Sequence, residues 1–369
     1  MNKGSFLLRQ WSSNSPKLSA VAEADVSNAK DEEVSVLGLK WHPEKDTLSI
    51  ARKIKEQPRS KVNTKRTVTS ESASVFDPLG FLGPLHVPAK SFVNQLWQAG
   101  KDWDDRLSLA ENKQWSKVQV SLSRAHEIKI PRWLVDDATQ PLDIIIFCDA
   151  CPTTAVGCVA YAKQGTRVGL IGSKNKIVSQ KNAKQTVPKL ELMAMVMGAQ
   201  YGEILRKTYA KECFTIDITY ATDSEIALYW LKSEKKLTPF VMNRVNFIRE
   251  KSDSNKWYHV ATKENSADIL SRGATYEELQ SSTWETGPVW LKQDKCEWPF
   301  VDVCDKPKNI RISLAASLEI DNIFQTRDAG NTSTRPDLQA VIDISKFSSY
   351  QKLLRVTALV TRARYQRKE

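Results

Sequence analysis

The spacing of apolar residues divides the chain into two parts that meet near residue 140. Before that point, apolar residues recur every three to four positions in residues 89–98 and 110–125, which predicts amphipathic helices. Residues 64–76 are also predicted to be helical, and Pro78 and Gly80 then favour a break and a turn. A short strand is predicted over residues 34–41, so this part is expected to be mostly helical.

The pattern changes at residues 142–149, which form a nearly continuous apolar, β-branched run typical of a buried central strand. Further strands are predicted over residues 155–162, 167–172, 214–222 and 256–260. Helices are predicted over residues 190–207, 224–231, 239–251 and 266–271. The order βββ-α-β-α-α-β-α predicts an α/β fold, a five-stranded mixed sheet with flanking helices, preceded by a mostly helical domain.

Composition narrows the class of protein. The chain has 369 residues, 41% hydrophobic and 26% charged, as is ordinary for a globular protein. No apolar run approaches the roughly 18–20 residues of a membrane span, and the first residues lack a secretory signal, which predicts a cytoplasmic or nuclear protein that is not secreted. A net charge of +11 favours a polyanionic partner such as nucleic acid.

The six cysteines do not predict a metal site. Cys148 and Cys151 form a CxxC pair, but no second pair and no nearby pair of histidines could complete a zinc site. The cysteines are therefore expected to be reduced and mostly buried.

Four acidic residues stand where strands end or helices begin. Asp149 and Asp223 each end a strand, and the two strands are predicted to be neighbours in the sheet. Glu191 lies in the first turn of a helix and Asp268 in the last short helix. Each alone has an ordinary explanation, as a solvated strand end, a helix N-terminal charge or an N-cap. Together, four carboxylates repel one another unless cations neutralise them, and oxygen ligands favour two Mg²⁺ or Mn²⁺ ions over zinc.

The motifs around these acids are residues 147–150, 188–192, 222–224 and 259–273. Together they resemble the ribonuclease H domain of BEL/Pao-type LTR retrotransposon polyproteins, a region often labelled Pao retrotransposon peptidase. Residues 76–84 resemble the segment that joins reverse transcriptase to that domain. The sequence departs from the family pattern at Cys151, where a serine is usual, and at Ser266, where a proline is usual.

The resemblance implies five segments, of which the third is ribonuclease H-like. They are the end of reverse transcriptase (1–62), a helical connection domain (63–139), the ribonuclease H-like domain (140–275), a tryptophan-containing extension (276–325), and a linker with a basic helix leading toward integrase (326–369). The basic helix is predicted over residues 345–367.

The resemblance also implies roles for the four acids, which are the predicted catalytic and metal-binding residues. Asp149 would bridge two Mg²⁺ ions, Glu191 and Asp223 would serve the ion on the leaving-group side, and Asp268 would hold the ion that activates water. Mn²⁺ is a possible substitute.

Residues 163–189 contain seven basic residues and no acidic residue. Charge runs are usually solvated loops, but beside a carboxylate cluster this run is interpreted as a face that contacts phosphates. The predicted substrate-binding residues are Lys174, Lys176, Lys181, Lys184, Gln185 and Ser224, the last two as candidates for reading the RNA 2′-hydroxyl.

Three functions remain open. The first is a Mg²⁺-dependent endonuclease that cleaves the RNA strand of RNA–DNA hybrids, as part of a retrotransposon polyprotein in a virus-like particle or the nucleus. The second is a non-catalytic fragment, or one that depends on missing reverse transcriptase and integrase parts, since no Tyr-x-Asp-Asp polymerase motif occurs. The third is an aspartic peptidase, which is disfavoured because no Asp-Thr-Gly or Asp-Ser-Gly occurs.

Overall fold

The computed structural model describes residues 13–15, 17–18, 34–36, 38–51, 62–135, 137, 139–179, 185–210 and 215–305. All of them belong to one compact unit, Met1–Leu318. The helix predicted over residues 345–367 and the linker before it lie outside the described residues. The division of the chain into five segments stays a prediction.

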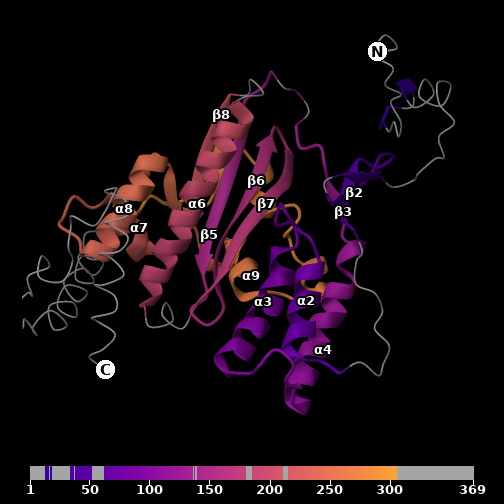
Figure 1. The fold of residues 1–369 in the computed structure, drawn as a ribbon. Helices are drawn as coiled ribbons and strands as arrows, with labels where there is room; N and C mark the ends of the chain where they lie inside the picture. The colour runs from indigo at the N-terminus through magenta and orange to yellow at the C-terminus, as the bar shows by residue number, and fades with distance from the viewer. Residues whose placement is uncertain are drawn as a thin grey trace, which may run out of the picture. The chain divides into compact units, whose positions relative to one another are not determined.

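A five-stranded mixed sheet forms the centre of the fold (Figure 1), as predicted from the apolar runs. Its strands in spatial order are β7 (Arg167–Ile177), β6 (Ala155–Gln164), β5 (Leu142–Ala150), β8 (Ile216–Thr222) and β9 (Trp257–His259). The β5 strand pairs antiparallel with β6 and parallel with β8, and β8 pairs parallel with β9. All residues of β6 are buried, and so are all of β5 except Asp143, because both faces of the sheet are covered.

One face of the sheet is covered by α6 (Val187–Ala210), α7 (Glu225–Lys232) and α8 (Pro239–Lys251). Ile144, Ile146 and Cys148 of β5 point to this side and pack in one cluster with Leu192 and Met195 of α6. Although α6 runs for 24 residues, neither it nor another helix in the described part of the chain is long and apolar enough to cross a membrane.

Helices from both ends of the described chain share the opposite side of the sheet. They are α2 (Lys65–Ser74), α3 (Gly83–Gln98), α4 (Leu109–Ser123), α9 (Ala267–Arg272) and α10 (Tyr276–Ser281). Phe147 and Tyr161 of the sheet belong to the same apolar cluster as Phe92 of α3 and Trp115 of α4. The rings of Phe92 and Trp115 are stacked with centroids 5.5 Å apart. The helices before residue 140 and the sheet are therefore joined by one core.

The segment after α10 forms hydrogen bonds both to the turn before α3 and to β6. Trp284 donates its indole N–H to the carbonyl of Phe81, at 2.7 Å, and its own carbonyl accepts the hydroxyl of Tyr161 at 2.8 Å. Trp284 and Tyr161 are both buried. Three short 3₁₀ helices follow, at Val289–Lys292, Lys295–Glu297 and Val303–Asp305. Among the described residues, further 3₁₀ helices lie at Ala125–Glu127, Ser254–Lys256 and Thr262–Glu264.

The prediction of a single strand over residues 34–41 is wrong, because the chain reverses its direction within this segment. Two strands, β1 (Val34–Val36) and β2 (Leu39–His42), pair antiparallel, and Gly38 between them has a φ of 86°, which favours glycine. They form a second sheet, in the order β1-β2-β3-β4, with β3 (Thr47–Ile50) and β4 (Ile130–Pro131).

Two other predictions need correction. The helix predicted from residue 89 begins at Gly83, because Pro84 stands in its first turn, where a missing N–H costs nothing. The cysteines are not mostly buried: of the five that the structure describes, all are free, Cys148 and Cys158 are buried, Cys151 is half-buried, and Cys296 and Cys304 are exposed.

Gly198 lets α6 approach β5, which gives a testable prediction. A Cβ at Gly198 would lie 2.3 Å from Sγ of the buried Cys148. Replacing Gly198 by Ala should therefore lower the free energy of unfolding by about 1–3 kcal/mol, although alanine is the better helix former. Urea unfolding measures this, with Gln200→Ala, an exposed site on the same helix, as the control. Equal or greater stability of the Gly198→Ala variant would contradict the close packing.

Candidate functional site

The pairing register of β5 and β8 brings two of the four predicted acids together. Cys148 stands opposite Thr222 in this parallel pair, and Asp149 and Asp223 are the next residue of each chain segment. Asp149 is only 6% exposed, and Thr222 is fully buried. Since parallel strands end at the same edge of a sheet, the two carboxylates share this edge.

Asp149 is a buried acid with a raised pKa. Burial, together with the charges of Asp223 and Asp268, raises its pKa to about 6, although a hydrogen bond from the Ser271 hydroxyl opposes the shift. Ser271 lies on α9 and is fully buried. The Asp149 carboxylate thus has a hydrogen-bond donor, Ser271, and two neighbouring acids, Asp223 and Asp268.

Glu191 has a similar environment on α6. Burial, together with the charges of Asp223 and Asp149, raises its pKa to about 7. The hydroxyl of Ser224 donates a hydrogen bond to Glu191 and opposes the shift. Ser224 is the N-cap of α7 and also accepts the N–H of Ala227, so one side chain fixes both the helix start and the acid.

Asp268 joins the same group from α9. Burial raises its pKa, an ion pair with Arg272 at 2.8 Å lowers it, and the charge of Asp223 raises it. Beside it, Asn265 donates to Oδ1 of Asp223 at 3.2 Å and to the carbonyl of Cys148 at 3.0 Å. Asn265 is 4% exposed and so ties the ends of β5 and β8 to the loop before α9. All four predicted acids therefore interact electrostatically at one edge of the sheet.

The donor chemistry of this group fits a hard divalent cation. The four groups offer only carboxylate oxygens, and their mutual repulsion is the kind that bound cations relieve. The present side-chain arrangement is not a closed cage, since no group of three or more histidine, cysteine or acidic side chains among the described residues is arranged to hold an ion. Ser224, Ser271 and Arg272 instead contact the carboxylates of Glu191, Asp149 and Asp268.

The predicted substrate-binding residues are only partly placed. Lys174 and Lys176 are exposed on β7, and Gln185 is half-buried shortly before α6. Lys181 and Lys184 lie outside the described residues. The side chain of Ser224 is 4% exposed and directed at Glu191, so its hydroxyl is engaged within the protein.

Two residues of the site, Ser271 and Asn265, had no predicted role. Both stand in the motif of residues 259–273, and Ser271 follows Asp268 by three positions, which places them on one side of a helix. That spacing was a usable signal for Ser271. Asn265 acts through loop geometry, for which the sequence carries no comparable signal.

The raised pKa values of Asp149 and Glu191 predict how stability depends on pH without divalent cations. Both values lie above the ordinary 3.8 and 4.5. The folded state therefore binds a proton at each of these two carboxyl groups more tightly than the unfolded state does. The stability that this protonation contributes is complete below about pH 4 and is lost as the pH rises through about 6 and 7.

In EDTA, the melting temperature should therefore fall as the pH rises from about 5 to 8, and the Asp149→Asn, Glu191→Gln double variant should show a smaller fall. Asp143→Asn, at the other end of β5, is the control. An identical pH dependence in the double variant would show that these acids do not titrate in this range.

One family model matches part of this chain. Residues 64–224 match the family model of the Pao retrotransposon-like RNaseH-like domain. The matched segment runs from the start of α2 to just past β8 and contains Asp149, Glu191 and Asp223, whereas Asp268 lies beyond it. No curated protein matches the chain.

Several solved structures are similar in part. The foamy viral protease-reverse transcriptase dRH in complex with ds DNA is 14% identical, with a TM-score of 0.41 over 62% of this chain and 38% of that chain. The foamy viral protease-reverse transcriptase in complex with RNA/DNA hybrid is 15% identical, with a TM-score of 0.40 over 62% and 29%. RNase H1 from the halophilic archaeon Halobacterium salinarum NRC-1 is 18% identical, with a TM-score of 0.27 over 39% and 100%.

The chain thus spans less than two fifths of the two foamy viral proteins, and similarities this low carry no argument about activity. The family match and the sheet order carry the assignment, and they confirm the resemblance drawn from the motifs. Residues 64–224 are thus similar to the Pao retrotransposon-like RNaseH-like domain, and the α/β fold of the chain is RNase H-like.

Proposed function

We propose that this chain is a Mg²⁺-dependent endonuclease that cleaves the RNA strand of RNA–DNA hybrids as part of a retrotransposon polyprotein. The observation that carries the proposal is the mutual interaction of Asp149, Glu191, Asp223 and Asp268 at the edge of an RNase H-like sheet. Acids whose pKa is raised by burial and by neighbouring charges, as for Asp149, Glu191 and Asp268, are enriched at functional sites.

The four acids are the proposed ligands of two Mg²⁺ ions, with Mn²⁺ as a substitute. Asp149 is assigned to both ions, Glu191 and Asp223 to the ion on the leaving-group side, and Asp268 to the ion on the water side. When bound, two such ions activate a water molecule and stabilise the leaving oxygen of a phosphodiester.

The protein's own contribution is to hold these carboxylates in place. Ser271 and Ser224 donate hydrogen bonds to Asp149 and Glu191, and Asn265 does the same for Asp223. Ser271, Ser224 and Asn265 are each at most 4% exposed, so packing fixes their positions. The carboxylates are thus oriented before substrate arrives, which reduces the reorganisation needed during the reaction.

The basic face beside the acids is the proposed contact for nucleic acid. Asp149 pairs with Gly157 of β6, and Gly157 pairs with Asn175 of β7, so the exposed Lys174 and Lys176 flank the same end of the sheet. Lys181, Lys184, Gln185 and Ser224 are retained as proposed substrate contacts. Lysines placed in this way position a nucleic-acid backbone and make binding depend on salt.

Replacing Asp149 by Asn tests the activity. The variant keeps the size of the side chain but loses the charge that two cations would share. Cleavage of a labelled RNA–DNA hybrid in Mg²⁺ should fall by about a thousandfold or more, since loss of metal binding costs several kcal/mol of transition-state stabilisation.

Asp143→Asn is the matched control, because it makes the same change on the same strand, where Asp143 pairs with Lys295 at 2.6 Å. This control should cleave at the wild-type rate. Equal cleavage by the Asp149→Asn variant would exclude the proposed site.

One observation favours a second candidate, a nucleic-acid-binding fragment that is active only with the rest of a polyprotein. The ion pair between Arg272 and Asp268 occupies one proposed ligand, and the carboxylates are not arranged around an ion. Tight hybrid binding without cleavage at every Mg²⁺ or Mn²⁺ concentration would favour this candidate.

A further inference from the structure

Arg272 forms an ion pair with one of the four proposed metal ligands. Its guanidinium contacts Oδ1 of Asp268 at 2.8 Å, and Asp268 lies four residues earlier on α9. A serine or an asparagine, which are uncharged donors, contacts each of the other three acids, Asp149, Glu191 and Asp223. The proposed chemistry uses Asp268 but gives no role to Arg272.

The backbone that carries this ion pair is held by close packing of α9. Leu270, which lies between the two residues, is fully buried. A Cβ at Gly83 of α3 would lie 2.6 Å from one methyl carbon of Leu270, and a Cβ at Gly157 of β6 would lie 2.8 Å from the other. Gly273 ends the helix with a φ of 81°, and a Cβ there would lie 2.7 Å from Pro88 of α3. Helix α9 is therefore wedged between α3 and the sheet.

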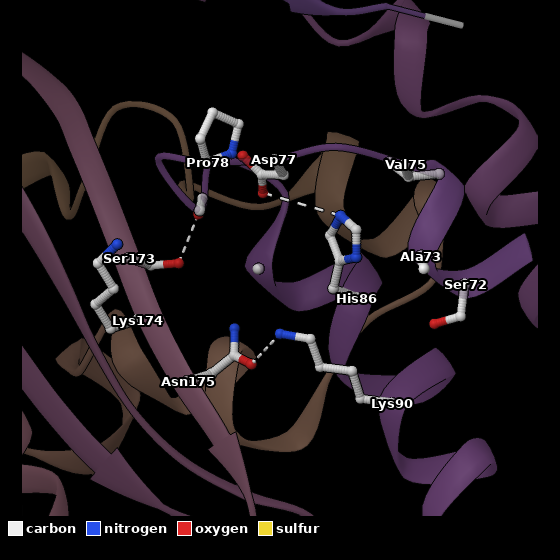
Figure 2. A pocket seen from close by; sticks show the side chains of 12 residues that line it. Ser72, Ala73, Val75, Asp77, Pro78, His86, Lys90, Ser173, Lys174 and Asn175 are labelled. Carbon is white, nitrogen blue, oxygen red and sulfur yellow. Dashed lines mark hydrogen bonds and ion pairs between the residues drawn. The ribbon is translucent and has the colours of Figure 1, made fainter. Parts of the chain in front are cut away.

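Helix α3 is in turn held against β7, beside a pocket of about 320 Å³ (Figure 2). Ser173 of β7 donates its hydroxyl to the carbonyl of Gly80, in the turn before α3. Lys90 of α3 donates to Oδ1 of Asn175 on β7 at 3.0 Å. The support of α9 is therefore fixed on both sides, and moving its backbone would disturb these contacts.

The side chain of Arg272, by contrast, can leave Asp268 without any rearrangement of the core. It is 63% exposed, and the side chain of Asp268 is 30% exposed. An exposed ion pair between residues four apart on a helix is weak, because water and salt screen its charges. Rotation of the Arg272 side chain into solvent would therefore change the charge beside Asp268 while the carboxylate itself stays in place.

Arg272 and a divalent cation cannot hold the same carboxylate oxygen together. Ligand oxygens lie about 2.0–2.1 Å from Mg²⁺. A guanidinium 2.8 Å from the same oxygen would stand against the ion. Two positive charges this close repel each other strongly. The contact of Arg272 with Asp268 therefore opposes the binding of a cation at this carboxylate.

We propose that Arg272 competes with divalent cations for Asp268, holding this carboxylate when no ion is bound and releasing it when an ion binds. The proposal rests on the proposed function, because it takes Asp268 as a metal ligand. Arg272 is then a positioning residue that sets the cation concentration at which the site fills. Until that concentration is reached, it neutralises one of four acids that repel one another.

The test is Mg²⁺ binding to the full chain without nucleic acid, measured by isothermal titration calorimetry. Arg272→Gln should bind Mg²⁺ about threefold more tightly than the wild type, as expected when one weak competitor is lost. Lys207→Gln is the matched control, because Lys207 pairs at the same distance, 2.8 Å, with Glu203 four residues earlier on α6. The control should bind Mg²⁺ as the wild type does. Unchanged or weaker binding by Arg272→Gln would overturn the proposal.

Thermal melts separate this role from a purely structural one. In EDTA, Arg272→Gln should melt at a lower temperature than the wild type, because the four acids lose a neutralising charge. Saturating Mg²⁺ should stabilise the variant more than the wild type, since tighter binding to the folded state adds more stability. An ion pair that only stabilised α9 would give the same deficit in both conditions, and that result would contradict the competition.

Two further variants locate the effect. Arg272→Lys keeps the positive charge and should bind Mg²⁺ as the wild type does, whereas binding as tight as that of Arg272→Gln would exclude a competition between charges. In an Asp268→Asn background, Arg272→Gln should no longer tighten Mg²⁺ binding to the three remaining acids, because the contested carboxylate is gone. An equal gain in that background would show a general effect of charge and overturn the proposed contact.

The outcomes separate this proposal from the proposed function. If the wild type binds Mg²⁺ and cleaves hybrid but Arg272→Gln binds as the control does, only the proposal for Arg272 is wrong. If Arg272→Gln binds Mg²⁺ more tightly but no form of the protein cleaves hybrid, the proposal for Arg272 stands and the nuclease proposal fails. If the wild type and the variants bind neither Mg²⁺ nor Mn²⁺, the proposed metal site is wrong, and the proposal for Arg272 falls with it.

Discussion

The parallel pairing of β5 with β8 is the constraint on which the site depends. It places Cys148 opposite Thr222, so that the acid following each residue lies at the same edge of the sheet. A shift of one residue in this register would turn one acid toward the opposite face. The register is held by the burial of alternating side chains on both faces, and Asn265 adds a bond to the carbonyl of Cys148 at the strand end. The same buried side chains therefore stabilise the core and hold the carboxylates in position.

Four neighbouring carboxylates repel one another, and uncharged hydrogen-bond donors offset part of this repulsion. Serines and an asparagine contact three of the acids, and Asp268 forms an ion pair with Arg272. Neutral donors stabilise a carboxylate without cancelling its charge. The site therefore keeps the negative potential that attracts divalent cations, while the side chains remain ordered.

Most of the sheet was predictable from the sequence, because apolar runs and strand-end acids are local signals. The order of the elements along the chain and the neighbouring positions of β5 and β8 followed from them. Features that depend on a single backbone conformation were not predictable, as Gly38 shows, where a positive φ turns one expected strand into a hairpin. The contact of Ser271 with Asp149 spans 122 residues. The hydrogen bond from Lys90 to Asn175 spans 85 residues, and such long-range contacts leave no local signal in the sequence.

The hydrogen bonds through Trp284 bear on where this protein can be cut. These hydrogen bonds connect three buried residues, Phe81, Tyr161 and Trp284, which come from three of the five predicted segments. A polypeptide ended at residue 275 would leave the Tyr161 hydroxyl and the Phe81 carbonyl without these partners, at about 1–3 kcal/mol for each buried group. The apolar face that carries Phe147 would also lose part of its cover. The segment that carries the four acids is consequently shorter than the segment that supplies the buried contacts of the sheet.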